Sequence, residues 1–245
     1  MKKLILSVLL IPAVFSAQQT VSRDAEIANY VSQVSADSLK SHINKLVSFG
    51  TRHTMSSTTD AKKGIGAARN WVLSKFKNYA KNADGRMEVF LQSQTIQPDG
   101  KRINQPTDLG NAIAILRGTD PNDKRIFMIG GHLDSRVSDV MNAKDFAPGA
   151  NDDGSGVGAV IESARILSQS KFPATIVFVA FSGEEQGLLG AKMLAEKAKN
   201  ENWQLEALLN NDMVGNNLSS ETNLINANQL RVFSEGLPQF DLDKK

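Results

Sequence analysis

Histidine and carboxylate residues that can bind a metal ion occur in this sequence in four short clusters. His132 and Asp134 follow two glycines in the segment GGHLDS, and Asp152 lies in the glycine-rich segment PGANDDGSG. Backbone in such a turn can approach a ligand closely, because glycine has no Cβ atom. Glu185, in FSGEEQG, and Asp212, in NNDMVG, complete the set. One imidazole nitrogen combined with carboxylate oxygens is a ligand set that suits zinc.

These residue types are compatible with two adjacent metal sites. His132, Asp152 and Asp212 can form the first site, and Glu185 can begin a second. Asp152 can bridge the two sites, since a carboxylate has two oxygens. Asp134, two residues after His132, can accept a hydrogen bond from the other ring nitrogen and fix the tautomer. Paired metals about 3.5–4 Å apart suit hydrolysis, because they can polarise a carbonyl and activate water.

Glu184 is a candidate general base beside the metals. Adjacent residues in a turn point in different directions, so Glu185 can bind metal while Glu184 faces the substrate. In that position Glu184 can take a proton from water and deliver it to a leaving amine. The alternative is a solvated acidic turn. An apolar strand directly before the pair favours the catalytic interpretation.

Three short apolar segments are predicted to be the strands that position these clusters. Residues 126–129, 174–181 and 205–209 are apolar on both faces, as buried strands are, and each ends just before one of the clusters. In open α/β sheets, ligands bind beyond the carboxyl ends of the strands. The clusters are therefore expected to meet at one edge of a sheet.

The remaining periodicity predicts helices and further strands along the chain. The helices are expected at 35–47, 59–79, 153–169 and 187–199, and further strands at 87–91 and 111–116. The expected helix caps are Ser35 or Asp37, Thr59 or Asp60, and Asp153 or Ser155. His42 is expected to be solvent-exposed, and His53 to be structural or exposed. The fold class is thus α/β, with a mixed, largely parallel central sheet flanked by helices.

The composition is that of a globular protein without thiol chemistry. The chain has 245 residues, of which 41% are hydrophobic and 22% charged, enough for one α/β domain with a core. It has no cysteine, which excludes disulfides, thiolate metal ligands and a cysteine nucleophile. Residues 18–245 are expected to form one catalytic domain.

The N-terminus has the pattern of a secretory signal peptide at residues 1–17. Lys2 and Lys3 precede an apolar stretch, which ends in small residues and is too short to cross a membrane. The alternative is a buried N-terminal helix. Cleavage would leave 26 basic and 26 acidic side chains, so neither nucleic acid nor a membrane anchor is expected. Export to the periplasm or the medium is the expected localisation.

The four segments together resemble the zinc-dependent aminopeptidase family that includes bacterial leucyl aminopeptidase. More distant relatives are the glutamate carboxypeptidases and glutaminyl cyclases, and the resemblance is specific from about residue 111 to residue 216. It implies a three-layer zinc exopeptidase fold with two co-catalytic zinc ions, and the N-termini of peptides or proteins as substrates. It implies these roles: His132 and Asp212 on one zinc, Asp152 bridging, Glu185 on the other zinc, Glu184 as general base and Asp134 supporting His132.

One departure from the family concerns the second zinc. The family supplies a second histidine ligand later in the chain, whereas this sequence has only His42, His53 and His132. The chain is therefore expected to be C-terminally truncated and to hold at most one zinc tightly. Two alternatives stay open, namely a single-zinc glutaminyl cyclase and a degenerate, inactive homologue. The sequence predicts neither the side-chain preference nor the oligomeric state.

Overall fold

The computed structural model describes residues 24–218, 225, 227 and 231–233. The predicted signal segment 1–17 and the tail from residue 234 lie outside these residues. The chain divides into two units, residues 1–33 and 34–245, of which the first contains helix α1 (Ala25–Ser32). Asp24 caps α1 by accepting hydrogen bonds from the next backbone N–H groups. No helix in the described part of the chain is long and apolar enough to cross a membrane.

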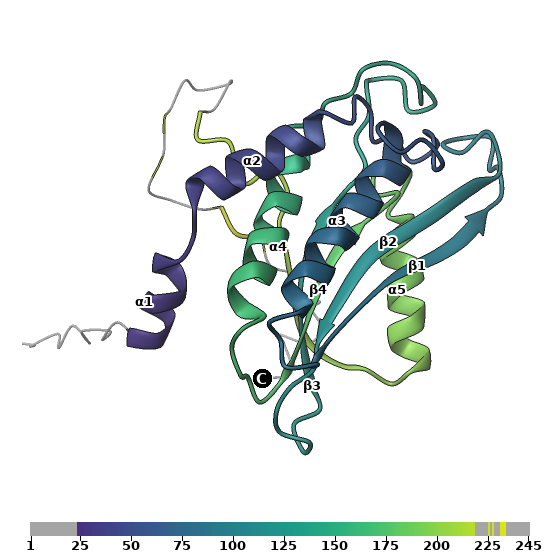
Figure 1. The fold of residues 1–245 in the computed structure, drawn as a ribbon. Helices are drawn as coiled ribbons and strands as arrows, with labels where there is room; N and C mark the ends of the chain where they lie inside the picture. The colour runs from purple at the N-terminus through teal and green to yellow at the C-terminus, as the bar shows by residue number, and fades with distance from the viewer. Residues whose placement is uncertain (1–23, 219–224, 226, 228–230, 234–245) are drawn as a thin grey trace, which may run out of the picture. The chain divides into compact units, whose positions relative to one another are not determined.

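The larger unit is built on a mixed sheet of five described strands (Figure 1). The strands are β1 (Met87–Ile96), β2 (Thr107–Leu116), β3 (Arg125–His132), β4 (Thr175–Phe181) and β5 (Gln204–Asn210). Their order is β1-β2-β4-β3-β5, in which β1, β2 and β4 pair antiparallel whereas β4, β3 and β5 pair parallel. The predicted α/β class with a mixed sheet is confirmed, and half of the described pairings are parallel.

Helices cover both faces of this sheet. Helices α2 (Ala36–Val47), α3 (Gly64–Ala80) and α4 (Gly154–Leu167) lie on one face, and α5 (Leu189–Asn200) lies on the other (Figure 1). Strand β2 serves both cores by alternation, since Ala112 and Ala114 face the first group of helices and Ile113 faces α5. The result is the three-layer arrangement that the family resemblance implies.

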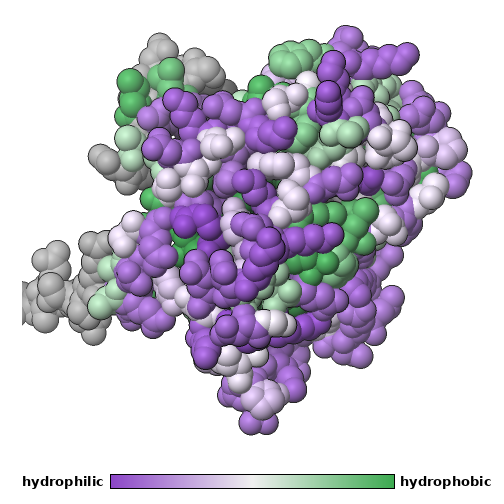
Figure 2. Space-filling model, in the orientation of Figure 1, coloured by the Kyte–Doolittle hydropathy of each residue, from purple (hydrophilic) through white to green (hydrophobic). Residues whose placement is uncertain are grey.

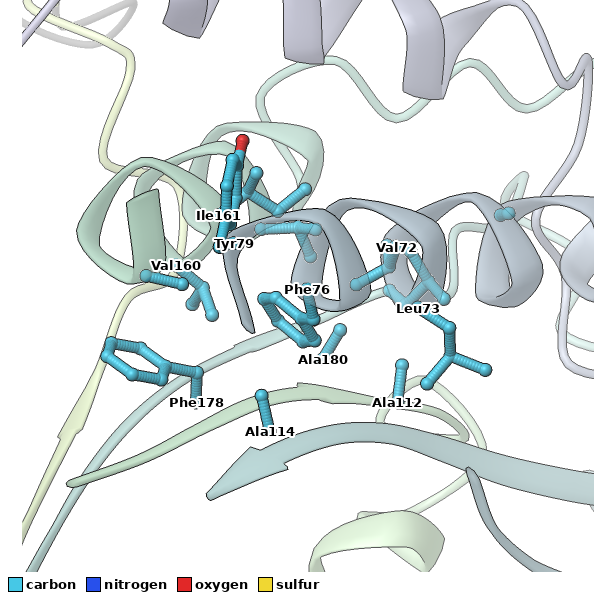
Figure 3. Close-up of a cluster of buried hydrophobic side chains, with 14 of the residues drawn as sticks. Val72, Leu73, Phe76, Tyr79, Ala112, Ala114, Val160, Ile161, Phe178 and Ala180 are labelled. Carbon is cyan, nitrogen blue, oxygen red and sulfur yellow. The ribbon is translucent and has the colours of Figure 1, made fainter. Parts of the chain in front are cut away.

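The core between α3, α4 and the sheet combines large and small apolar side chains from both layers. Phe76 of α3 points onto Ala112, Ala114 and Ala180 of the sheet, and Phe178 packs beneath Val160 and Ile161 of α4 (Figure 3). The surface over α2 is mostly hydrophilic, and a hydrophobic patch lies beside α3 (Figure 2). The apolar residues that helical periodicity places on one side of α3 are all buried, although α3 starts later than predicted; they are Ile65, Ala68, Val72, Phe76 and Tyr79.

The predicted cap of α3 at Thr59 or Asp60 is wrong. The helix begins at Gly64 after Lys63, which makes no side-chain cap. The preceding loop satisfies the first N–H groups of the helix instead, since Ile65 N donates to Ser56 Oγ at 2.9 Å. Asp60 accepts from the N–H groups of two lysines before the helix and so stabilises the loop.

The sequence predicts that strand β5 is buried, but its leucines are exposed. Leu205 and Leu208 are both 44% exposed and Leu209 is 63% exposed. Among the described strands β5 pairs only with β3, so it lies at an edge of the sheet. An apolar sequence predicts a strand here correctly, but burial also needs a covering layer, which the described elements do not provide.

His42 is buried, whereas the sequence predicts an exposed side chain. Its residue is 5% exposed, and its ring packs edge-on against Trp71 with centroids 5.9 Å apart. Neither ring nitrogen has a hydrogen-bond partner in the described residues. Burial, followed by the nearby charge of Lys75, lowers the pKa of His42. The prediction fails because a neighbouring helix covers this position of α2, as the contact with Trp71 of α3 shows.

Candidate metal centre

The carboxyl ends of β3, β4 and β5 carry three of the predicted clusters to one edge of the sheet. These strands run parallel, so the loops after them leave the sheet on the same side (Figure 1). His132 is the last residue of β3, and Asp212 follows the end of β5 at Asn210. Asp152 lies in the turn directly before α4. The expected convergence at one sheet edge is what the structure shows.

His132, Asp152 and Asp212 form a cluster whose potential ligand atoms all lie within 4.8 Å of one another. His132 Nε2 lies 3.0 Å from Asp152 Oδ1 and 3.9 Å from Asp212 Oδ1. The imidazole is 3% exposed, whereas the carboxylates are 50% and 42% exposed. The cluster thus has a buried nitrogen donor at its base and two oxygen donors that face solvent.

The electrostatics of this cluster favour a positive charge at its centre. Burial is the largest single influence on His132 and would lower its pKa, but the carboxylates of Asp134 and Asp152 outweigh it and raise the pKa to about 11. The same contact with His132 lowers the pKa of Asp152. Two ligands on one zinc are separated by about 3.4 Å when the metal bonds are 2.0–2.2 Å long. The donor types and their separations therefore fit a zinc ion.

Asp134 supports His132 differently from the prediction. The backbone carbonyl of Asp134, not its carboxylate, accepts the hydrogen bond from His132 Nδ1, at 3.1 Å. The nearer carboxylate oxygen is 3.8 Å from Nδ1. The carboxylate is fully buried and accepts instead from Thr54 Oγ1 and from the N–H groups of Glu184 and Glu185. Asp134 thus joins the loop after β3 to the loop after β4, and its carbonyl leaves His132 Nε2 free to bind a metal.

Asp153 has a role beyond the helix cap that the sequence predicts. It caps α4 as expected, since its carboxylate accepts from Gly156 N at 2.9 Å. The carboxylate also accepts from His132 N at 2.9 Å and from Met213 N at 3.2 Å. Burial raises the pKa of Asp153 to about 7, against the opposing charge of His132. One buried side chain thus ties together backbone beside all three members of the cluster.

Glu185 lies outside the cluster and is paired with an arginine. Its Oε2 atom is 2.6 Å from Arg136 Nε, and the Glu185 side chain is 13% exposed. Arg136 also donates to the carbonyls of Val137 and Ser138, both at 3.2 Å. Arg136 is not among the residues that the sequence motifs predict for the site. Its position directly after GGHLDS was the available signal.

Glu184 directly precedes Glu185 on the loop after β4, and it is half-buried. Burial raises the pKa of its carboxyl group; the charge of His132 opposes this shift, and the neighbouring carboxylates of Asp134, Glu185 and Asp212 add to it. A raised pKa suits a group that must both accept and donate a proton.

His53 lies in a buried polar network behind Asp134. It is fully buried, and its Nε2 atom lies 3.0 Å from the carbonyl oxygen of Val140. Its Nδ1 accepts from Met55 N at 3.1 Å. Thr54, the neighbour of His53, connects Asp134 to Gln186 through its hydroxyl group. Within the described residues, His53 therefore acts as a structural residue rather than as part of the metal-ligand cluster.

Comparisons with known proteins agree on a family. The model of peptidase family M28 matches residues 111–235. A probable zinc metalloprotease of Pyrenophora teres f. teres is 46% identical over 216 residues, which cover 88% of this chain and 46% of that protein. A probable zinc metalloprotease of Pyricularia oryzae is 42% identical and is matched over 42% of its length. The chain thus spans less than half the length of these curated relatives.

Solved structures with the same fold include enzymes of two kinds. The Legionella pneumophila LapA aminopeptidase matches with a TM-score of 0.62 at 21% identity, over 87% of this chain and 52% of that one. The Porphyromonas gingivalis glutaminyl cyclase matches with a TM-score of 0.60 at 24% identity, over 75% of this chain and 62% of that one. At such identities the likeness shows the fold alone.

Proposed function

Because the chain belongs to peptidase family M28, we propose that it is a zinc-dependent peptidase whose metal is held by His132, Asp152 and Asp212. The observation that carries this proposal is the approach of one buried imidazole nitrogen and two carboxylates to within 4.8 Å at the edge of the sheet. The curated relatives named as probable zinc metalloproteases support the choice of metal. We further propose that the enzyme removes N-terminal residues from peptides or proteins.

The residues around the metal divide the catalytic work. A bound zinc ion would polarise the scissile carbonyl and acidify a water molecule. Asp134 orients His132, because its carbonyl oxygen accepts a hydrogen bond from Nδ1–H of the imidazole. Glu184, held by the hydrogen bond from its own N–H to Asp134, takes a proton from the attacking water and passes it to the leaving amine.

We propose that this chain holds a single zinc ion tightly. A second ion between Asp152 and Glu185 would have to displace Arg136 from Glu185, where the two side chains form a 2.6 Å contact. It would also lack a histidine, because His42 and His53 are both buried in other contacts. The ion pair between Glu185 and Arg136 and the small ligand set both disfavour a second site.

Hydrolysis of aminoacyl anilides by the purified chain tests the proposed activity. We expect a slow rate that a chelator abolishes and added zinc restores, and we expect Asp152→Ala to lose the rate together with the metal. A rate that survives chelation would contradict the proposal. The low absolute rate follows from the incomplete second site.

Glutaminyl cyclisation is the second candidate. Two observations favour it: the described residues contain one three-residue cluster, and the Porphyromonas gingivalis glutaminyl cyclase shares the fold. Incubation with peptides that begin with glutamine or with leucine separates the two activities. Ammonia release from the first peptide indicates a cyclase, and free leucine from the second indicates an aminopeptidase.

We also propose that residues 1–17 direct export to the periplasm or the medium, as their basic and apolar pattern indicates. Sequencing the N-terminus of the protein recovered outside the cytoplasm tests this. Intact Met1 on exported protein would contradict it.

A further inference from the structure

Arg52 is a fully buried arginine directly behind the proposed metal centre. Arg52 is 1% exposed, and all its side-chain hydrogen bonds in the described part of the chain go to backbone carbonyls. Nε donates to Leu133 at 2.7 Å, and Nη1 to Pro148 at 2.6 Å and to Leu46 at 3.2 Å. Nη2 donates to Gly149 at 2.9 Å. One guanidinium therefore joins three separate segments.

Two of these segments carry the proposed zinc ligands. Leu133 directly follows His132, and the turn at residues 148–149 leads into Asp152. The Arg52 backbone adds a second connection, because its N–H donates to Ser135 Oγ, and this hydroxyl donates to the carbonyl of Ala147. The loop after β3 and the turn before α4 are thus fixed to each other through Arg52 and Ser135.

The packing around Gly149 shows how closely the turn fits against this arginine. Gly149 has φ +48°, and a Cβ atom there would lie 2.9 Å from Arg52 Nη2 and 2.6 Å from Ser135 Cβ. It would also overlap the carbonyl oxygen of Asp152. The position of Asp152 therefore depends on the position of the guanidinium.

Arg52 differs in this respect from Arg69, the other strongly buried arginine among the described residues. Arg69 is 4% exposed and pairs with Asp108 at 2.9 Å, which neutralises its charge. Arg52 forms no such ion pair in the described residues, and its charge faces the acidic cluster. Burial lowers the pKa of Arg52 to about 10, although the carboxylates of Asp134, Asp153 and Asp152 oppose the shift, so it stays charged at neutral pH.

We infer that Arg52 is a positioning residue for the metal centre, which holds His132 and Asp152 at the separation that one zinc ion requires. A lysine cannot replace it, because an ammonium group is a single point and cannot span carbonyls on three segments as a planar guanidinium does. The inference rests on the zinc site proposed above. It adds a residue whose effect on the metal is indirect.

Zinc affinity and the absorption spectrum of the cobalt-substituted chain test this inference. We expect Arg52→Lys to weaken zinc binding by about 10–100-fold, as loss of residues that orient ligands commonly does, and to change the cobalt spectrum. Ser135→Ala removes only the second connection, so we expect a smaller weakening in the same direction. Arg69→Lys is the matched control, and its zinc affinity should stay within about two-fold of the unaltered chain, since distant sites act independently.

The outcomes separate the inference from the function on which it rests. Zinc affinity and cobalt spectra unchanged in Arg52→Lys, despite a lowered melting temperature, would show a purely structural role and overturn the inference. If Arg52→Lys does not fold, unchanged affinity in Ser135→Ala overturns it instead. Failure of the unaltered chain to bind zinc would contradict the proposed function and the inference with it.

Discussion

Glu184 is the residue on which the proposed chemistry depends most, because its carboxylate is the proposed general base. We expect Glu184→Gln to retain zinc and to lose turnover by about 10²–10⁴-fold, because the amide cannot accept the proton. Its backbone bond to Asp134 is unaffected by the change, so the loop should keep its position. Zinc content and kcat measured on the same sample test this. A near-normal kcat would show that another group acts as the base.

For individual residues, the sequence predicted which side chains form the site better than it predicted their hydrogen-bond partners. His132, Asp152 and Asp212 were grouped from their types and their positions after strands, and the structure brings them together. The partner of His132 Nδ1 was expected to be a carboxylate and is a backbone carbonyl. Main-chain acceptors carry no residue type, so sequence patterns do not reveal them. The cap bond from Gly156 N to Asp153 was predicted, but the bonds from His132 N and Met213 N were missed, because their donors are backbone N–H groups.

Helix α4 is joined to the start of α2 by a buried carboxylate. Glu162 accepts from Ser35 N at 2.8 Å and from Arg165 at 2.7 Å and 2.9 Å. Burial opposes ionisation of Glu162, but the bonds from Arg165 and Ser35 outweigh it, so the pKa of Glu162 lies below its ordinary value. A carboxyl with a lowered folded-state pKa stabilises the fold above its unfolded pKa of about 4.3. That contribution is lost as the pH falls through the folded-state pKa.

Glu162→Gln should therefore destabilise the chain in a pH-dependent way. We expect its free energy of unfolding to be lower by about 1.5–3 kcal/mol at neutral pH, because hydrogen bonds to a charged group are lost. The difference from the unaltered chain should shrink as the pH falls below the unfolded-state pKa of about 4.3 towards the lowered folded-state pKa of Glu162. Urea unfolding of Glu162→Gln and of the unaltered chain, at neutral pH and at acidic pH, tests this. An equal difference at both would mean that the charge of Glu162 contributes nothing.

Element types were predictable because they depend on local periodicity. The apolar stripe of α3 and the apolar run of β4 each correspond to a buried face in the structure. The start of α3 was not predictable, since the loop at Ser56 rather than a capping side chain satisfies its first N–H groups. The burial of His42 was missed because it arises from contact with a neighbouring helix, at Trp71 of α3, and periodicity within α2 does not contain such a contact.

For the molecule as a whole, the described chain presents an apolar edge at β5. Leu209 on this strand is 63% exposed, whereas Leu194 on α5 is 2% exposed. The curated relatives extend well beyond the matched region, since the chain covers less than half of their length. The sequence predicted β5 as buried because it has the composition of a core strand.

Truncation of these two leucines should therefore have very different effects on this chain. Leu194→Ala should lower the free energy of unfolding by about 2–5 kcal/mol, because it leaves a cavity in the core. Leu209→Ala should change it by no more than about 0.5 kcal/mol, as exposed substitutions usually do. Chemical denaturation of both variants compares them directly. Equal costs would show that β5 is covered in solution.

The central claim is that one zinc ion binds between His132, Asp152 and Asp212, and its most direct test is a zinc titration of the purified chain. The expected result is one tightly bound ion per chain in the unaltered protein and none in His132→Ala, Asp152→Ala or Asp212→Ala. Glu185→Gln should retain the ion, because Glu185 pairs with Arg136 outside the cluster. Zinc binding that survives in the His132→Ala and Asp152→Ala variants, or no binding by the unaltered chain, would contradict the claim.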